Sequence, residues 1–230
     1  MIRRFPEPRD LFDPTRTIFQ YSDLDSIVPF TSTVSGTAAG ITFNTAALTY
    51  TNRYGFATIT QGSTSTGRAA LGSANQDQIV LNAGEVRIKA SILTPSALSD
   101  ATNRYNLYFG MTGSFSSPGA ATNRTLIRYR DNLNSGKWQL DVSNTLGVST
   151  ADTGITVAAS TFYELELVIG RASGAVTAYI NGSRVASVSG QTPNGTSEPL
   201  GIIVGTQKTA GTTARPFYAD FLSFYQEVDR

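Results

Sequence analysis

Apolar and polar residues alternate along most of the chain from about residue 32 onward, in short segments separated by clusters of Gly, Ser and Asn. The clearest alternation lies in residues 85–92, where every second residue is apolar: Val86, Ile88, Ala90 and Ile92. Because successive side chains of a β-strand point to opposite faces, this period of two predicts a strand with one buried and one wet face. The pattern as a whole predicts roughly a dozen strands and no amphipathic helix of ordinary length. The chain is therefore expected to be all-β.

Turn residues between neighbouring segments predict how several of these strands connect. Residues 125–131 and 137–142 flank a Gly-containing loop and are expected to form a hairpin. A later hairpin has Asn181-Gly182 at its turn, the preferred pair for a type I′ turn, in which both central residues need positive φ. This second hairpin belongs to an expected three-stranded meander of the segments 162–169, 175–180 and 183–188. Further strands are expected at 40–43, 56–60, 104–111, 200–204 and 217–225.

Two of these strands allow individual core residues to be predicted. Trp138, the only tryptophan, begins the return strand of the first hairpin and is expected in the core, with ligand stacking as the alternative. Leu140 and Val142 lie on the same side of that strand. In the last strand, unbroken alternation places Phe217, Ala219 and Phe221 on one face and Tyr218, Asp220 and Leu222 on the other.

The first 30 residues differ from the rest of the chain. Prolines at positions 6, 8, 14 and 29 interrupt any helix, while apolar and aromatic side chains recur between them. This predicts two parts, an extended N-terminal arm over residues 1–30 and a β-sandwich domain over residues 31–230. The arm is expected to anchor the domain on a neighbouring subunit through its apolar side chains: Phe5, Leu11, Phe12, Ile18, Phe19 and Tyr21.

Composition excludes several classes of function. The chain has no histidine and no cysteine, which excludes Ser-His-Asp catalysis, a cysteine nucleophile, disulfides and ordinary zinc sites. The formal net charge is +1 and the Lys and Arg residues are scattered along the sequence, so nucleic acid is not expected as a partner. Neither a signal peptide nor an apolar run of about 20 residues is present, so the protein is expected to be made in the cytoplasm and to have no membrane partner.

Few residues suggest chemistry, and no catalytic residue, metal or cofactor is predicted. Glu164 and Glu166 share one face of a predicted strand, the minimum for paired-carboxylate catalysis, but an ordinary solvent face explains them as well. Asp220, with Asp141 or Asp152, has the ligand type for calcium, although nothing in the sequence brings these carboxylates together.

An aromatic and basic cluster on a predicted loop is the best surface candidate. It consists of Tyr50, Arg53 and Tyr54. Aromatic rings and guanidinium groups together stack on sugars and on proteins. The cluster is expected to contact either a glycan or a neighbouring subunit.

The meander of residues 162–188 and the closing segment 217–224 resemble the last strands of concanavalin A-like lectin/glucanase and laminin G-like jelly rolls. This resemblance implies a two-sheet antiparallel jelly-roll sandwich. The chain lacks the Glu-x-Asp-x-x-Glu strand of the glycosidases and the Asp- and Asn-rich metal loop of the lectins. Without the glycosidase strand, the resemblance does not imply hydrolysis.

The small-residue composition and the apolar arm further resemble structural proteins of tailed bacteriophages. That resemblance implies a virion protein that decorates the capsid or forms a tail-fibre module, with other virion subunits as partners and a homotrimer favoured. A carbohydrate-binding adhesion module that recognises a host-surface glycan is the alternative function.

Overall fold

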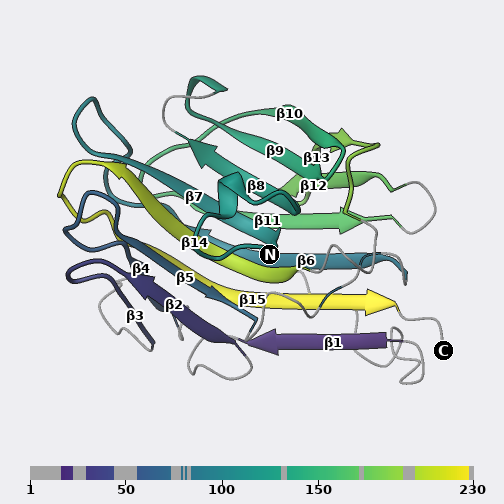
Figure 1. Ribbon diagram of the computed structural model, residues 1–230, viewed down its shortest axis with the longest axis horizontal. Coiled ribbons are helices and arrows are strands. Elements are labelled where there is room, and N and C mark those ends of the chain that lie inside the picture. The colour runs from purple at the N-terminus through teal and green to yellow at the C-terminus, as the bar shows by residue number, and fades with distance from the viewer. Residues whose placement is uncertain are drawn as a thin grey trace.

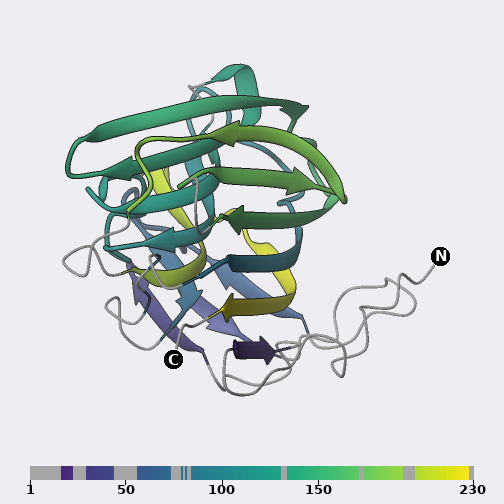
Figure 2. The same ribbon diagram turned by 90° about the vertical axis from the view of Figure 1, so that its right-hand side faces the viewer.

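The computed structural model describes residues 30–43, 56–73, 79, 81, 84–130, 134–170, 174–193 and 200–227, and the backbone of 17–22. Within these residues the chain forms fifteen strands and two short 3₁₀ turns, Pro118–Ala120 and Asn134–Gly136. The strands make two antiparallel sheets that pack face to face (Figures 1 and 2). The predicted all-β jelly-roll sandwich is therefore confirmed. No helix in this part of the chain is long and apolar enough to cross a lipid bilayer.

The first sheet, sheet A, contains the predicted meander and the last strand of the chain. Its strands, in spatial order, are β13 (Ser183–Val188), β12 (Val176–Ile180), β11 (Phe162–Ile169), β6 (Val86–Leu93), β15 (Phe217–Glu227), β4 (Ala57–Thr60) and β3 (Gly40–Thr42). An additional strand, β1 (Thr17–Ser22), pairs antiparallel with the C-terminal half of β15. At the turn between β12 and β13, Asn181 and Gly182 have φ values of 53° and 77°, as the type I′ prediction requires.

The second sheet, sheet B, contains the predicted hairpin as its strands β8 (Arg124–Arg130) and β9 (Lys137–Asn144). Its strands, in spatial order, are β10 (Gly147–Thr156), β9, β8, β7 (Arg104–Thr112), β14 (Gly201–Ala210), β5 (Arg68–Gly72) and β2 (Thr31–Ser35). β7, β8 and β9 are joined by consecutive antiparallel pairings, and β14 inserts between β7 and β5. This order places segments that are distant in the sequence side by side.

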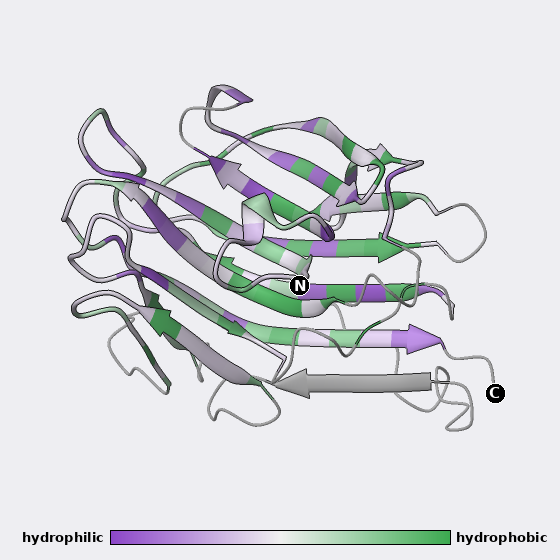
Figure 3. Cartoon of the chain, in the orientation of Figure 1, coloured by the Kyte–Doolittle hydropathy of each residue, from purple (hydrophilic) through white to green (hydrophobic). Residues whose placement is uncertain are grey.

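The hydrophobic core fills the space between the two sheets. Figure 3 shows the alternation of apolar and polar residues along the strands from which it is built. Trp138 is fully buried, and its ring meets those of Tyr163 and Tyr129 edge to face at 5.5 and 6.4 Å between centroids. Such pairs contribute beyond the apolar area they bury. The predicted core position of the tryptophan is confirmed.

The predicted alternation of the last strand holds only for its first half. Phe217 and Ala219 are buried as expected, but a β-bulge between Ala219 and Phe221 shifts the register against β6. An extra residue in one strand reverses which side chains face the core from that point on. Leu222 and Phe224 therefore face the core, and the prediction that placed Phe221 with Phe217 is wrong.

Part of the predicted arm lies along the domain. β1 pairs with β15 from Thr17 opposite Glu227 to Ser22 opposite Leu222 (Figures 1 and 2). Phe30, the last residue of the predicted arm, is 2% exposed and belongs to the core. Residues 1–16 and 23–29 lie outside the described residues, so the division of the chain at residue 30 stays a prediction.

Candidate functional site

The outward side of sheet B carries a group of charged and amide side chains. In β7 the core residues alternate with Asn106 and Tyr108, and in β8 they alternate with Arg128 and Arg130. Because strand side chains alternate between faces, these residues point away from sheet A. We call the whole set the cationic face, and its residues are Arg68, Arg104, Asn106, Tyr108, Arg124, Arg128, Arg130, Lys137, Gln139, Asp141, Asp152 and Gln207.

The register of sheet B arranges these side chains in rows across the strands. The first row runs from β5 to β8 and contains Arg68, Gln207, Asn106 and Arg130. The second row runs from β7 to β9 and contains Tyr108, Arg128 and Gln139. Neighbouring strands are about 4.8 Å apart, so members of a row are close enough to act on one ligand.

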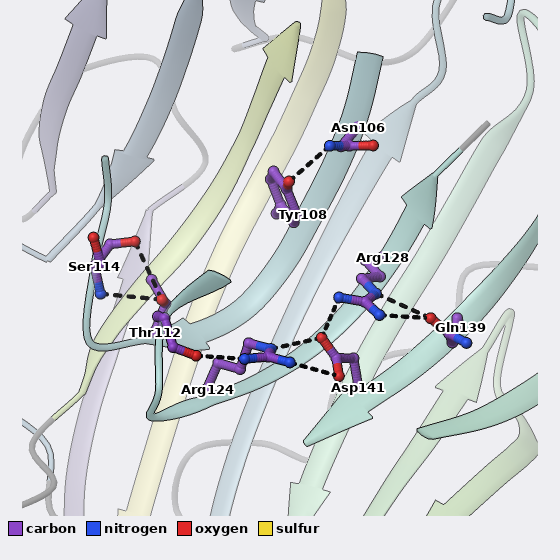
Figure 4. A network of polar contacts seen from close by, with 9 residues as sticks. Asn106, Tyr108, Thr112, Ser114, Arg124, Arg128, Gln139 and Asp141 are labelled. Atoms are coloured by element: carbon purple, nitrogen blue, oxygen red, sulfur yellow. Dashed lines mark hydrogen bonds and ion pairs between the residues drawn. The ribbon is translucent and has the colours of Figure 1, made fainter. Parts of the chain in front are cut away.

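A buried ion-pair network holds the centre of the cationic face (Figure 4). Arg124 donates from Nε to Asp141 Oδ2 at 2.7 Å and from Nη2 to Oδ1 at 3.3 Å, while its Nη1 donates to the Ala121 carbonyl. Arg128 Nη1 contacts the same Asp141 Oδ2. Arg128 also donates from Nε and Nη2 to Gln139 Oε1, at 3.0 and 2.9 Å. One fully buried carboxylate therefore faces two buried guanidinium groups, and one positive charge is left uncompensated.

The tyrosine of the second row is held as a hydrogen-bonding group. Asn106 Nδ2 donates to Tyr108 Oη at 2.9 Å (Figure 4). Burial raises the pKa of Tyr108, and this effect exceeds the opposite effects of the Asn106 hydrogen bond and of nearby Arg130 and Arg128. The phenol is therefore protonated at neutral pH, which suits hydrogen bonding and does not suit a catalytic base.

The two arginines of the first row each keep a buried donor unused. The Nε atoms of Arg68 and Arg130 are buried and have no hydrogen-bond partner within the described part of the chain. Arg68 donates from Nη1 to the Ser116 carbonyl at 3.0 Å.

Burial lowers the pKa of Arg128, Asp141 opposes that shift, and the like charges of Arg130 and Arg124 lower it further. These cations therefore lie close enough to repel one another.

The outward side of sheet A has a different charge pattern. Arg87 pairs with Glu85 at 2.6 Å and with Glu166 at 3.7 Å, and Lys89 pairs with Glu164 at 3.1 Å. Cations and carboxylates thus alternate and neutralise one another on that face. The excess of positive charge is a property of sheet B.

The loop of residues 113–123 covers one end of the cationic face. Phe115 of this loop packs in a small cluster of buried residues with Ala70, Tyr108, Leu126 and Ile203. A Cβ added at Gly119 would lie 3.0 Å from Tyr108 Oη, so the loop lies directly over that hydroxyl. The first row borders this loop, because Arg68 donates to the Ser116 carbonyl. Three members of the row are partly exposed, Arg68, Gln207 and Arg130, whereas Asn106 is buried.

Most of the site residues predicted from the sequence cannot be compared with this geometry. Phe5, Leu11, Phe12, Tyr50, Arg53 and Tyr54 lie outside the described residues. Ile18, Phe19 and Tyr21 fall in β1, of which only the backbone is described. Their roles in partner or glycan contact stay predictions.

The carboxylates considered for chemistry do not assemble into a site. Glu164 and Glu166 point outward from sheet A and pair with cations of β6. Asp141 and Asp152 pair with cations of sheet B, whereas Asp220 lies on β15 of sheet A. Within the described residues, no group of three or more His, Cys, Asp or Glu side chains could hold a metal ion.

The cationic face itself was missed in the sequence, where its cations are scattered. A local signal exists in residues 124–130, where Arg124, Arg128 and Arg130 occupy positions of one parity and so share a strand face. Arg68 and Gln207 gave no such signal, because only the pairing of β5 and β7 with β14 brings them to the same row.

Comparison with known proteins gives one family and one fold. A family model described as "SO2946-like, C-terminal domain" matches residues 52–220. The comparison with curated protein sequences gives no match.

Three solved structures illustrate the fold. The protein of unknown function SO2946 from Shewanella oneidensis MR-1 is 16% identical, with a TM-score of 0.65 over 99% of this chain and 97% of that chain. The endo-1,3-β-glucanase of Streptomyces sioyaensis is 14% identical, with a TM-score of 0.61 over 92% and 97%. Peanut lectin is 9% identical, with a TM-score of 0.61 over 93% and 99%. At these identities the likeness concerns the fold alone, which is that of the concanavalin A-like jelly rolls.

Proposed function

This chain belongs to the family described as SO2946-like, C-terminal domain, and from the geometry of sheet B we propose that it is a carbohydrate-binding domain. The cationic face is the binding surface in this proposal. The observation that carries it is the first row, in which the partly exposed amide of Gln207 lies in register with the partly exposed Arg68 and Arg130 on the outward side of the sheet. Amide and guanidinium groups are the hydrogen-bonding side chains that recognise hydroxyl-rich ligands.

Relatives of the fold support this choice of ligand. Solved structures that share the fold include peanut lectin, the endo-1,3-β-glucanase of Streptomyces sioyaensis and an endo-β-1,4-glucuronan lyase of Trichoderma reesei. A fold does not determine a function, so the proposal depends on the residues of the cationic face.

We propose binding without turnover. Glycoside hydrolysis needs two carboxyl groups that flank the scissile bond. The one buried carboxylate of the cationic face, Asp141, accepts hydrogen bonds from two arginines. Tyr108 has a raised pKa and is no better as a base than a free phenol. Glu164 and Glu166 belong to the other sheet and face away from this surface.

A glycan array of neutral and acidic saccharides, followed by titration calorimetry of any that bind, tests the proposal. Gln207→Ala, at a partly exposed first-row position, should weaken binding, because it removes an amide that bonds the ligand. Arg184→Ala, at an exposed position on β13 of sheet A, is the matched control and should leave binding unchanged. Failure of every saccharide to bind would overturn the proposal, and release of shorter glycan products would overturn the absence of turnover.

A second function is compatible with the first and concerns assembly. We propose that the chain is a structural protein of a virion, anchored by its N-terminal segment and trimeric, as its resemblance to structural proteins of tailed bacteriophages implies. The observation that favours it is β1, which adds to the edge of sheet A through β15. A strand at a sheet edge offers main-chain groups to a neighbouring chain.

Removal of residues 1–16, which leaves β1 in place, tests the second function. The shortened protein should unfold at the same urea concentration as the full chain but should no longer join its assembly. Light scattering of the full chain should give a trimer. A monomer in solution and in the assembly, or assembly that persists after the removal, would contradict this function and leave carbohydrate binding untouched.

A further inference from the structure

The charge of the cationic face restricts which glycan it can bind. We propose that its ligand is an acidic polysaccharide, with sugar carboxylates bound by the guanidinium groups of the first row. This inference rests on the proposed carbohydrate-binding function and names the class of glycan.

The first argument is the segregation of charge. The formal net charge of the whole chain is only +1. The outward-facing strand positions of sheet B hold six cationic side chains, Arg68, Arg104, Arg124, Arg128, Arg130 and Lys137, against two carboxylates, Asp141 and Asp152. Among the described strand positions of this face, cationic side chains therefore outnumber carboxylates by four, which favours a ligand with repeated negative charge.

The second argument is that guanidinium donors remain unused where the face is partly exposed. Arg130 and Arg68 each have a buried Nε–H without an acceptor within the described residues. A buried donor without a partner costs free energy, and a change of side-chain rotamer that brings the Nε–H to a ligand oxygen would remove the cost. The planar guanidinium also matches the two oxygens of a carboxylate, with which it forms two parallel hydrogen bonds.

The third argument is the geometry of the row. Arg68 on β5 and Arg130 on β8 are separated by two strands, β14 and β7, so their backbones lie about 14 Å apart at roughly 4.8 Å per strand. The amides of Gln207 and Asn106 lie between them. A chain of sugars that crosses the strands meets the guanidinium of Arg68, the amide of Gln207 and the guanidinium of Arg130 in turn, while Asn106 is buried. That order suits an extended polymer with separated carboxylates and hydroxyl groups between them.

The same row disfavours nucleic acid, the other common polyanion. Proteins that bind single-stranded nucleic acids combine a positively charged groove with exposed aromatic side chains on which the bases stack. The aromatic side chain of the cationic face is Tyr108, which is 4% exposed and packs against Phe115 and Leu126. No other aromatic side chain occupies an outward-facing strand position of sheet B within the described residues.

Binding of three probes to the full chain tests the inference: a defined polyuronate oligosaccharide, the same oligosaccharide with its carboxyl groups reduced to alcohols, and single-stranded DNA. We expect the polyuronate to bind at least ten-fold more tightly than the reduced oligosaccharide. Its affinity should also fall as salt is added, because the contacts are ionic. Equal affinity for the two oligosaccharides would overturn the inference and leave carbohydrate binding standing. Binding of neither would overturn the inference, and the glycan array would then decide whether the proposed function falls with it. Equal or tighter binding of DNA would show a general polyanion surface and would also overturn the inference.

Variants at Arg130 locate the contact. Arg130→Gln removes the positive charge and the paired N–H donors of the guanidinium group. We expect it to weaken polyuronate binding about ten-fold, the equivalent of one charge-assisted hydrogen bond. Arg130→Lys keeps the charge and should recover only part of the loss, because an ammonium group cannot pair bidentately. Arg184→Gln on sheet A is the matched control and should bind as the wild type does. An Arg130→Gln variant with an unchanged Kd and an unchanged unfolding midpoint would place the contact elsewhere and overturn the inference.

Discussion

The ion-pair network at the centre of the cationic face makes a quantitative prediction about stability. Asp141 is 0% exposed, and its two oxygens face Arg124 and Arg128, whose side chains are 8% and 6% exposed. Asp141→Asn keeps the shape of the side chain but removes its charge. Two buried guanidinium groups would then share no anion.

Breaking a buried ion pair by removal of one partner costs about 3–5 kcal/mol, because the remaining charge stays buried without compensation. We expect Asp141→Asn to lose stability in this range. For a domain of this size each kcal/mol lowers Tm by roughly 2–4 °C, so Tm should fall by roughly 6–20 °C.

Urea unfolding followed by the fluorescence of Trp138 provides the assay. This tryptophan is the only one in the chain and is fully buried, so its emission reports the unfolding of the core. The free-energy loss should appear as a lower urea midpoint at an unchanged m-value.

The control is Asp152→Asn on the neighbouring strand. Asp152 pairs with Lys137 at 3.0 Å, but its side chain is 44% exposed, and exposed pairs contribute little to stability. Its variant should unfold close to the wild type. If the two variants unfold at the same urea concentration, burial does not set the strength of the Asp141 pairs and the reasoning fails.

Three further predictions concern other parts of the fold. Burial lowers the pKa of Lys208 below its ordinary value of 10.5, so between the folded and the unfolded pKa the unfolded chain binds more protons than the folded chain. The stability of the protein should therefore rise with pH across that window. Urea midpoints measured at several pH values should show this rise, and Lys208→Met should abolish it. Gly62→Ala should destabilise the protein, because φ is +69° and a Cβ would lie 2.2 Å from a backbone oxygen. Gly154→Ala, at a φ of +74°, places its Cβ where no atom lies within 4 Å, so it should lower Tm less than Gly62→Ala does in thermal melts. Removal of residues 1–30 should cost about 3–5 kcal/mol more than removal of residues 1–29 in urea unfolding, because only the former deletes the buried ring of Phe30.

The short-range pattern of apolar, polar and turn residues was sufficient to predict most strands and some of the turns. The segment 162–169 is a strand with the predicted bounds, because strict alternation leaves no other way to bury Leu165 and Leu167 together. The turn at Asn181-Gly182 followed from positive φ, which these two residue types tolerate.

Four strands were missed: β1, whose residues were assigned to the extended arm, and three strands of sheet B whose own residues do not alternate in polarity. β2 is mostly exposed on both faces and rich in Ser and Thr, and β10 carries small and polar residues at the end of sheet B. β5 is an unbroken run of small and apolar residues, buried on both faces, which lacks the period of two. Such segments become strands through pairing with their neighbours, and pairing between distant segments is not encoded locally.

The candidate site depended on tertiary structure more than the fold did. The sequence by itself determined which positions of β7 and β8 face outward, and therefore that Arg124, Arg128 and Arg130 share a face. Only the order and register of sheet B decided that Arg68 and Gln207 complete the first row, and only the bulge in β15 decided which of its aromatic residues are buried. The physical reason is that alternation is a property of one strand, whereas a surface depends on the register between strands, which packing of the whole sandwich selects.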